Sequence, residues 1–150
     1  MKITTKGRYA LRIMVDLAQQ PADEFTALRN IAERQGISEK YSEMIISLLC
    51  KDGLVISSRG KGGGYKLSKT IDNYSVGDVL RASEGSLAPV SCLEQPENAC
   101  PRAGNCESLP MWKELDRLIE DYLDSVPITD LVRQAQLGAQ SGACIGSMLP

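Results

Sequence analysis

The sequence contains no histidine. This absence excludes Ser–His–Asp triads, histidine general bases and histidine metal ligands. Metal or redox chemistry in this chain would therefore have to use cysteine sulfur and oxygen ligands. Because no serine or cysteine can be paired with a candidate base either, we expect no enzymatic activity.

Aromatic residues and long apolar runs are also scarce. One Trp, one Phe and five Tyr in 150 residues favour an aliphatic core over a stacking surface for single-stranded nucleic acid. No apolar run approaches the roughly 20 residues of a membrane span. The first apolar stretch, residues 9–18, contains Arg12 and Asp16, which a signal peptide core does not tolerate. We therefore expect a cytoplasmic protein with no membrane partner.

Charge is divided unevenly along the chain, although the net charge is only −2. Residues 1–72 hold 12 Lys and Arg against 8 Asp and Glu, whereas residues 73–150 hold 5 against 11. A basic first half is typical of a protein that binds a polyanion, and chance variation in solvated charge is the alternative.

Hydrophobic periodicity predicts three helices in the first half, over residues 7–20, 26–35 and 38–53. Thr26 and Ser38 are the expected N-caps of the second and third. Two short strands follow at 54–58 and 65–67, joined by a glycine-rich turn that contains Arg59 and Lys61. This order predicts a mainly α fold: a winged helix-turn-helix with a small β-hairpin wing.

The second half predicts a different organisation. A capping-box pattern, Ser75 to Asp78, opens a helix that ends near Glu84. A loop over 86–108 precedes a long helix over 109–126, whose broad apolar stripe favours dimerisation, with packing on its own domain as the alternative. A short helix over 129–137 is expected next. The predicted divisions are thus a DNA-binding domain (1–85), a cysteine-rich loop (86–108), a dimerisation segment (109–137) and a flexible tail (138–150).

The third helix has the polar leading face that a major-groove helix needs. Ser38, Lys40, Tyr41, Glu43 and Met44 supply this face, which we expect to bind double-stranded DNA. A carboxylate beside phosphates is useful mainly as an acceptor from cytosine N4, so Glu43 is either a base contact or a solvated helix charge.

The glycine-rich turn carries Arg59 and Lys61, which can approach phosphates or enter a narrow minor groove. A phosphate-cradling nucleotide loop needs glycines that lead from a strand into a helix. Here they lead into a strand, which favours the wing. One such module contacts few base pairs, so we expect a homodimer.

Cys92, Cys100 and Cys106 lie in the predicted loop, with seven and five residues between them. Three thiolates can hold an iron–sulfur cluster or zinc, but structural zinc sites favour closer pairs and four ligands. Free or redox-active thiols are the other alternative. Cys50 is expected to be an inert core thiol and Cys144 an exposed thiol in the tail.

A family resemblance is carried by MKITTKGRYA (1–10), IAERQGIS (31–38), GLV (53–55) and RGKGGGY (59–65). These segments closely resemble the bacterial winged-helix regulators that include IscR, NsrR and CymR. The resemblance, which covers about residues 1–135, implies a homodimeric repressor or activator with 109–126 as its dimerisation helix. It also implies a [2Fe–2S] cluster on Cys92, Cys100 and Cys106, supplied by the iron–sulfur cluster assembly machinery. Glu43 would discriminate DNA sites, and Arg59 would reach the minor groove.

The chain departs from this family pattern at the fourth cluster ligand. Leu109 stands where the iron–sulfur regulator has its histidine, and Arg8 stands where some nitric-oxide sensors have a carboxylate. Glu107, Ser108, an oxygen ligand from the partner subunit, a small thiol or water are the candidates. Met44 stands where relatives often have glutamine.

The sequence hypothesis is a dimeric DNA-binding transcriptional regulator that senses iron–sulfur cluster status. One alternative is a cluster-free regulator of cysteine or sulfur metabolism with a thiol switch. An alternative of another class is a small iron–sulfur redox or interaction protein, which the basic wing and the charge division disfavour.

Overall fold

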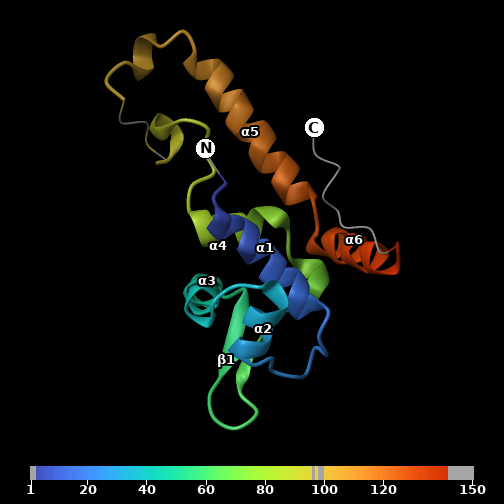
Figure 1. The fold of residues 1–150 in the computed structure, drawn as a ribbon. Coiled ribbons are helices and arrows are strands. Elements are labelled where there is room, and N and C mark those ends of the chain that lie inside the picture. The colour runs from blue at the N-terminus through green and yellow to red at the C-terminus, as the bar shows by residue number, and fades with distance from the viewer. Residues whose placement is uncertain (1–2, 96, 98–99, 142–150) are drawn as a thin grey trace.

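The structure, a computed structural model, describes residues 3–95, 97 and 100–141. It is mainly helical, with a single two-stranded antiparallel sheet among these residues. The elements in chain order are α1 (Thr5–Ala18), α2 (Leu28–Gln35), α3 (Glu39–Lys51), β1 (Val55–Ser58), β2 (Gly64–Leu67), α4 (Val76–Glu84), α5 (Leu109–Ser125) and α6 (Ile128–Ser141), with 3-10 helices at Ile71–Asn73, Ser91–Leu93 and Ala103–Asn105. The predicted winged helix-turn-helix with a long C-terminal helix is confirmed (Figure 1). None of the helices described is long and apolar enough to cross a membrane.

The helix starts of α3 and α4 follow from their capping residues. Ser38 has extended backbone angles and accepts a hydrogen bond from the Tyr41 N–H at 3.2 Å. Ser75 Oγ accepts from the Asp78 N–H at 3.1 Å, and Asp78 Oδ2 accepts from the Ser75 N–H at 2.9 Å. These bonds satisfy N–H groups that have no partner inside a helix. The predicted Ser38 cap and the predicted capping box are thus confirmed.

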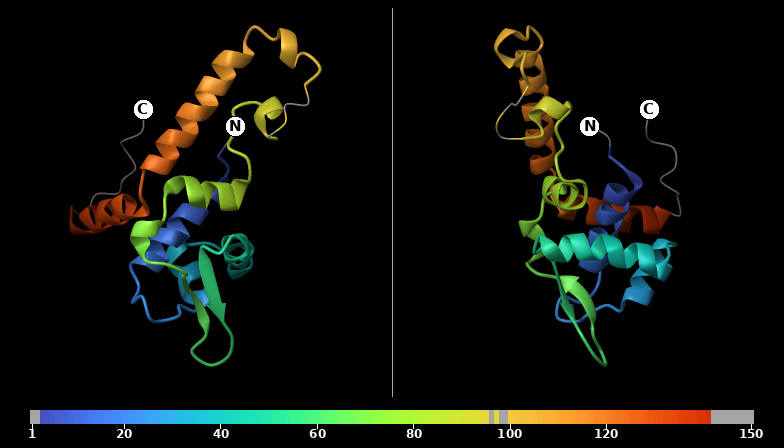
Figure 2. Two further views of the ribbon diagram at one scale, coloured as in Figure 1. Left: turned by 180° about the vertical axis from the view of Figure 1, so that it is seen from behind. Right: turned by 90° about the vertical axis from the view of Figure 1, so that its left-hand side faces the viewer.

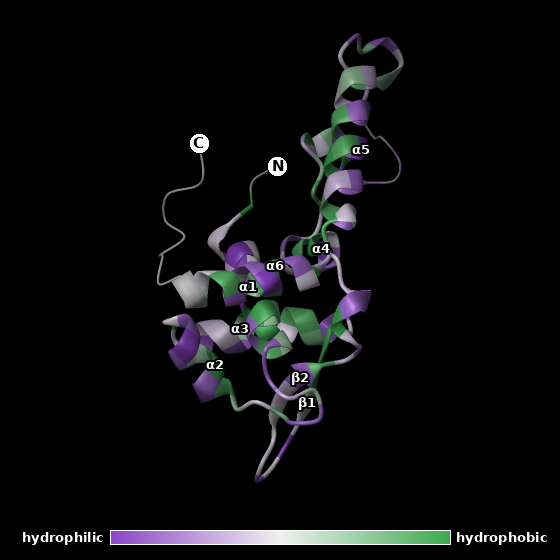
Figure 3. Ribbon diagram, turned by 90° about the vertical axis from the view of Figure 1, so that its right-hand side faces the viewer, coloured by the Kyte–Doolittle hydropathy of each residue, from purple (hydrophilic) through white to green (hydrophobic). Residues whose placement is uncertain are grey.

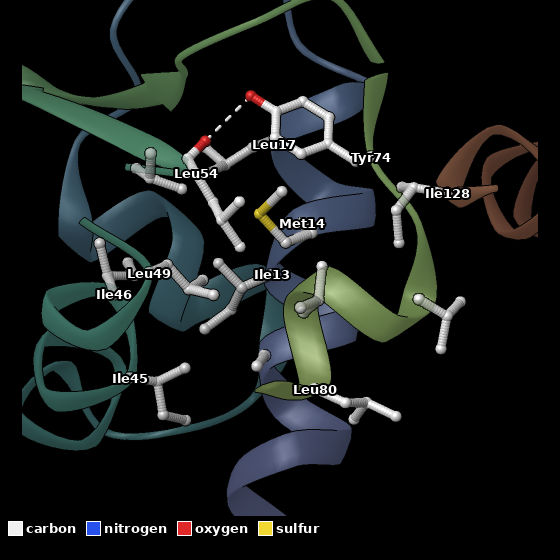
Figure 4. Close-up of a cluster of buried hydrophobic side chains, with 14 of the residues drawn as sticks. Ile13, Met14, Leu17, Ile45, Ile46, Leu49, Leu54, Tyr74, Leu80 and Ile128 are labelled. Atoms are coloured by element: carbon white, nitrogen blue, oxygen red, sulfur yellow. Dashed lines mark hydrogen bonds between the residues drawn. The ribbon is translucent and has the colours of Figure 1, made fainter. Parts of the chain in front are cut away.

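The core lies where α1, α3 and α4 meet, and it is aliphatic as predicted (Figure 4). The largest fully buried side chains include Ile13 and Met14 of α1, Ile45 of α3 and the phenol of Tyr74. The Tyr74 hydroxyl donates to the Leu54 carbonyl at 3.0 Å and accepts from the Lys69 N–H at 2.7 Å. Because this buried hydroxyl is satisfied by backbone at both ends of the hairpin, it ties the hairpin to the domain.

The hairpin is joined to the segment before α2, which corrects one prediction. Thr26 was the expected N-cap of α2, but Ala27 takes that position and its side chain supplies no capping bond. Thr26 instead forms a bridge with Tyr65: its N–H donates to the Tyr65 carbonyl at 2.9 Å and its carbonyl accepts from the Tyr65 N–H at 2.8 Å. A side chain at Gly64 would overlap the backbone of Thr26, so the close approach requires glycine there.

α5 projects away from the domain, and the cysteine loop (residues 86–108) runs from the end of α4 to the far end of α5, opposite the hairpin (Figures 1 and 2). The predicted helix over 109–126 is confirmed, and Pro110 lies in its first turn. The predicted helix over 129–137 begins at Ile128 and runs to Ser141. The end predicted at Leu137 was wrong because Gly138 continues the helix, at the modest cost of an interior glycine. Of the predicted tail, residues 142–150 lie outside the described residues.

α4 connects three parts of the molecule. Arg81 pairs with Glu120 at 2.9 Å and with Asp124, both on α5. At the end of α4, Glu84 accepts hydrogen bonds from the Thr4 N–H (2.8 Å), the Thr4 hydroxyl (2.7 Å) and the Gly7 N–H (2.9 Å) at the start of α1. A side chain at Gly7 would collide with this carboxylate. The cysteine loop therefore begins two residues after a side chain that is fixed to α1.

The Glu84 contact predicts an acid-sensitive contribution to stability. Burial alone would raise the pKa of Glu84, but the hydrogen bonds from Thr4 and Gly7 and the charge of Lys6 lower it below its ordinary value of 4.5. A depressed folded-state pKa stabilises the fold above that ordinary value, and the stabilisation disappears as the pH falls through the folded-state pKa. We expect Glu84→Gln to lower the free energy of unfolding by about 1–2 kcal/mol near pH 7. The difference from the wild type should shrink as the pH falls below 4.5.

Urea unfolding followed by circular dichroism from about pH 7 to about pH 3 measures this difference. Glu33→Gln, at an exposed position of α2, is the matched control and should follow the wild type. A Glu84→Gln curve that stays parallel to the wild type throughout would contradict the ionic role of Glu84.

Candidate nucleic-acid interface and cysteine loop

α3 presents one face to the core and the opposite face to solvent. Its buried positions are Ser42, Ile45, Ile46 and Leu49. The exposed residues of α3 are Glu39, Lys40, Glu43, Met44, Ser47 and Lys51. Ser38, the cap at the start of the helix, is exposed as well. The predicted contacts Ser38, Lys40 and Glu43 thus lie on one accessible surface of the suitable polar character.

Tyr41 is the exception among the predicted contacts, because its side chain is half-buried. Its ring meets the ring of Tyr9 edge to face, with centroids 5.9 Å apart. The Arg12 guanidinium lies 4.8 Å from the centroid of the Tyr9 ring and donates to the Gln35 side chain at 3.0 Å and its carbonyl at 2.9 Å. This cluster holds the start of α3 against α1 and the end of α2. Periodicity could not predict it, since the rings come from distant helices.

The wing (residues 55–67) places both predicted cations in solvent. β1 and β2 pair in register from Val55 with Leu67 to Ser58 with Gly64. Arg59 and Lys61 lie in the connecting loop and are exposed. The ammonium of Lys66, on β2, lies 4.9 Å from the centroid of the Phe25 ring. The wing is therefore a basic loop on a short sheet, without a helix following it as in a nucleotide-binding loop.

Tyr65, on β2, is half-buried and packs against the core. The pKa of its phenol is raised by burial first, and then by repulsion from Glu43 and Cys50 in their ionised forms. Cys50, predicted as a core thiol, packs against the core and has its own pKa raised by burial.

The cysteine loop contains three half-buried cysteines, which lie at or between its two 3-10 helices. Cys92 lies within Ser91–Leu93, Cys106 directly follows Ala103–Asn105, and Cys100 lies between these helices. The Cys106 sulfur lies 3.5 Å from the Ser108 hydroxyl, and this hydrogen bond is the main reason that the Cys106 pKa is lowered.

Thiolates are the usual ligands of iron–sulfur clusters, so the donor set fits such a cluster chemically. Among the described residues, however, no three His, Cys, Asp or Glu side chains are grouped to hold a metal ion. The candidate ligands thus share a loop without forming an assembled site. Ser108 occupies the N-cap position of α5, but its side chain makes no capping bond and meets Cys106 instead.

Comparison with known proteins gives a consistent result. Residues 3–134 match the Rrf2 family, described as an iron-dependent transcriptional regulator. The chain is 38% identical over 137 residues to protein rrf2 of Nitratidesulfovibrio vulgaris, covering 91% of each chain. It is also 38% identical over 137 residues to the HTH-type transcriptional regulator IscR of Erwinia tasmaniensis, covering 91% of this chain and 82% of that one.

Two solved structures share the fold over most of both chains. The global cysteine regulator CymR of B. subtilis superposes with a TM-score of 0.70 at 38% identity, covering 89% of this chain and 98% of that chain. IscR of T. potens superposes with a TM-score of 0.70 at 35% identity, covering 99% and 96%. The resemblance inferred from the sequence motifs is thereby confirmed. The chain belongs to the Rrf2 family of DNA-binding transcriptional regulators.

Proposed function

We propose that this regulator acts in the cytoplasm as a homodimer that binds a two-fold symmetric operator and senses iron–sulfur cluster status through its cysteine loop. The observation that carries the DNA-binding part is the capped, exposed face of α3 beside a basic wing. The names of the relatives support a regulatory role for this surface.

In this proposal α3 enters the major groove, whose width admits one helix. Ser38 and the free N–H groups at the start of α3 bind a phosphate, and Lys40 neutralises another. Glu43 accepts from cytosine N4, while Arg59 and Lys61 bind the adjacent minor groove and its phosphates. Tyr41 is a positioning residue, because its ring packs on Tyr9 and holds the start of α3.

Dimerisation is supported by the exposed side of α5. None of the residues of α5 is buried. Four large apolar side chains are exposed instead: Met111 by 51%, Leu115 by 37%, Leu118 by 51% and Tyr122 by 67%. Their alternating spacing of four and three residues is that of a helix-pairing seam. Figure 3 shows apolar residues along α5, which extends beyond the rest of the domain. We therefore propose that a second copy covers this stripe (residues 111, 115, 118 and 122).

The cysteine loop would hold a [2Fe–2S] cluster on Cys92, Cys100 and Cys106, with the cluster assembly machinery as donor. A bound cluster supplies a redox-active iron–sulfide group whose presence depends on iron and sulfur supply. A second candidate is a thiol switch without a cluster. It is favoured by the absence of a grouped ligand set in the described part of the loop and by the likeness to CymR.

DNA binding predicts a strong salt dependence. The full-length protein should select an enriched operator sequence from a random duplex library. This operator, labelled with a fluorophore, is the probe for the binding measurements. Arg59→Ala should weaken binding to it by about tenfold and reduce the salt slope by about one unit for each protomer. Fluorescence anisotropy over a range of salt concentrations measures both quantities.

Arg133→Ala removes the same charge from α6, where the side chain is 68% exposed and pairs with Asp130. This control should retain wild-type affinity. Equal losses in the two variants would attribute the effect to net charge and contradict the wing contact. Binding that does not depend on salt would contradict the interface.

The α5 stripe predicts that the oligomeric state depends on Leu118. Leu118→Glu places a charge in the middle of the seam and should convert a dimer to a monomer, which multi-angle light scattering detects as a halving of the mass. Lys113→Glu, at an exposed position of α5 outside the stripe, should remain dimeric. A dimer that survives Leu118→Glu would show that the protomers meet elsewhere.

The cysteine loop predicts visible absorption. Anaerobically purified protein should absorb broadly at visible wavelengths and contain iron and sulfide, and Cys92→Ala and Cys106→Ala should lose both. Cys50→Ala, which removes the thiol at the end of α3, is the matched control and should keep them. A colourless, iron-free wild type after attempted reconstitution would overturn the cluster and favour the thiol switch.

The same variants test whether the loop controls DNA binding. Loss of a loop cysteine should change the affinity for the selected operator, because the loop joins α4 to α5. Unchanged affinity across all selected operators would contradict a sensory role for the loop.

A further inference from the structure

One large apolar side chain lies on the exposed face of α3. Met44 is 43% exposed, between exposed neighbours Lys40 and Ser47. Residues separated by four and then three positions fall along one side of a helix, so Met44 lies in the middle of this face and not at its border with the core.

Packing within the domain does not account for Met44. It belongs neither to the buried cluster nor to the partly buried residues packed against that cluster. A single exposed apolar residue is common on protein surfaces. Met44 differs from such residues because its surroundings form the surface that carries the proposed function, beside Glu43 and on the same helix as the Ser38 cap.

The chemistry of the major groove offers one apolar partner for such a side chain. Base edges in the major groove present mainly hydrogen-bond donors and acceptors. The C5-methyl group of thymine is the apolar group among them. A methionine side chain is unbranched and polarizable, so it adapts to a small apolar group. It has no hydrogen-bond donor and only a weakly accepting sulfur. Met44 would therefore contribute little binding free energy at the polar edges of guanine, cytosine or adenine.

We propose that Met44 contacts a thymine methyl group and thereby sets the operator preference at one position of each half-site. The proposal rests on the proposed entry of α3 into the major groove. Consecutive Cα atoms are about 3.8 Å apart and base pairs rise by about 3.4 Å, so Met44 and Glu43 reach base pairs within about two steps of each other. Each half-site then contains a thymine close to the cytosine bound by Glu43.

Replacement of thymine by deoxyuridine removes only the methyl group and tests the contact directly. The probe is the operator selected from the random duplex library, with one symmetric pair of thymines replaced at a time. Wild-type affinity should fall roughly fourfold per half-site, and thus roughly sixteenfold for a symmetric pair, at one thymine pair only. Met44→Ala should bind the thymine operator about as weakly as the wild type binds the uracil operator, and it should not distinguish the two.

Ser47→Ala is the matched control on the same face. The Ser47 hydroxyl donates to the Glu43 carbonyl at 2.7 Å within the helix, so its removal should leave the response to uracil unchanged. Because Met44 is exposed, Met44→Ala should unfold at the wild-type temperature, which separates lost contact from lost fold.

Two outcomes overturn the methyl contact while DNA binding itself stands: wild-type affinity that is the same for thymine and uracil at every position, or a uracil effect that persists in Met44→Ala. A library that yields no enriched sequence contradicts the DNA-binding function itself and the methyl contact with it. The two failures are therefore distinguishable.

Discussion

The burial of α1 is the constraint on which the rest of the structure depends. Ile13 and Met14 are fully buried, and α1 packs against α2, α3, α4, α6 and β2. The first N–H groups of such a helix need partners, and Glu84 supplies them from the end of α4. Gly7 leaves room for that carboxylate. The position of α3 and the start of the cysteine loop are thus both set by contacts with one helix.

α4 is the junction between the parts that would bind DNA, sense and dimerise. Its Ser75 cap follows Tyr74, whose hydroxyl holds the base of the wing. Arg81 fixes α5 through two carboxylates, and Glu84 fixes α1. The cysteine loop connects the end of α4 to the start of α5, and the start of α5 lies far from α3 (Figure 1). Displacement of α5 against α4 would therefore act on the DNA-binding side through these contacts, and no direct contact with the loop is needed.

Much of the fold could be predicted because its signals are local. Helical periodicity gave the helices, and the Ser38 cap and the capping box at Ser75 gave two helix starts to the residue. The predictions failed at two places, once because a distant segment competed with a local signal and once because a local stop signal was too weak. Thr26 has a side chain that is typical of a helix N-cap, but its backbone forms an antiparallel bridge with Tyr65, which is distant in the sequence. Gly138 ends a helix on local propensity, yet α6 continues through it.

The sequence by itself determined the fold class, the family motifs and the candidate residues, because caps, apolar spacing and cysteine positions are properties of short segments. Only the tertiary structure decided which candidates are accessible. It left Glu43 and Met44 in solvent, turned Tyr41 onto Tyr9, and exposed one side of α5. The physical reason is that accessibility depends on which other segments pack against a residue, and those partners lie tens of residues away in the chain.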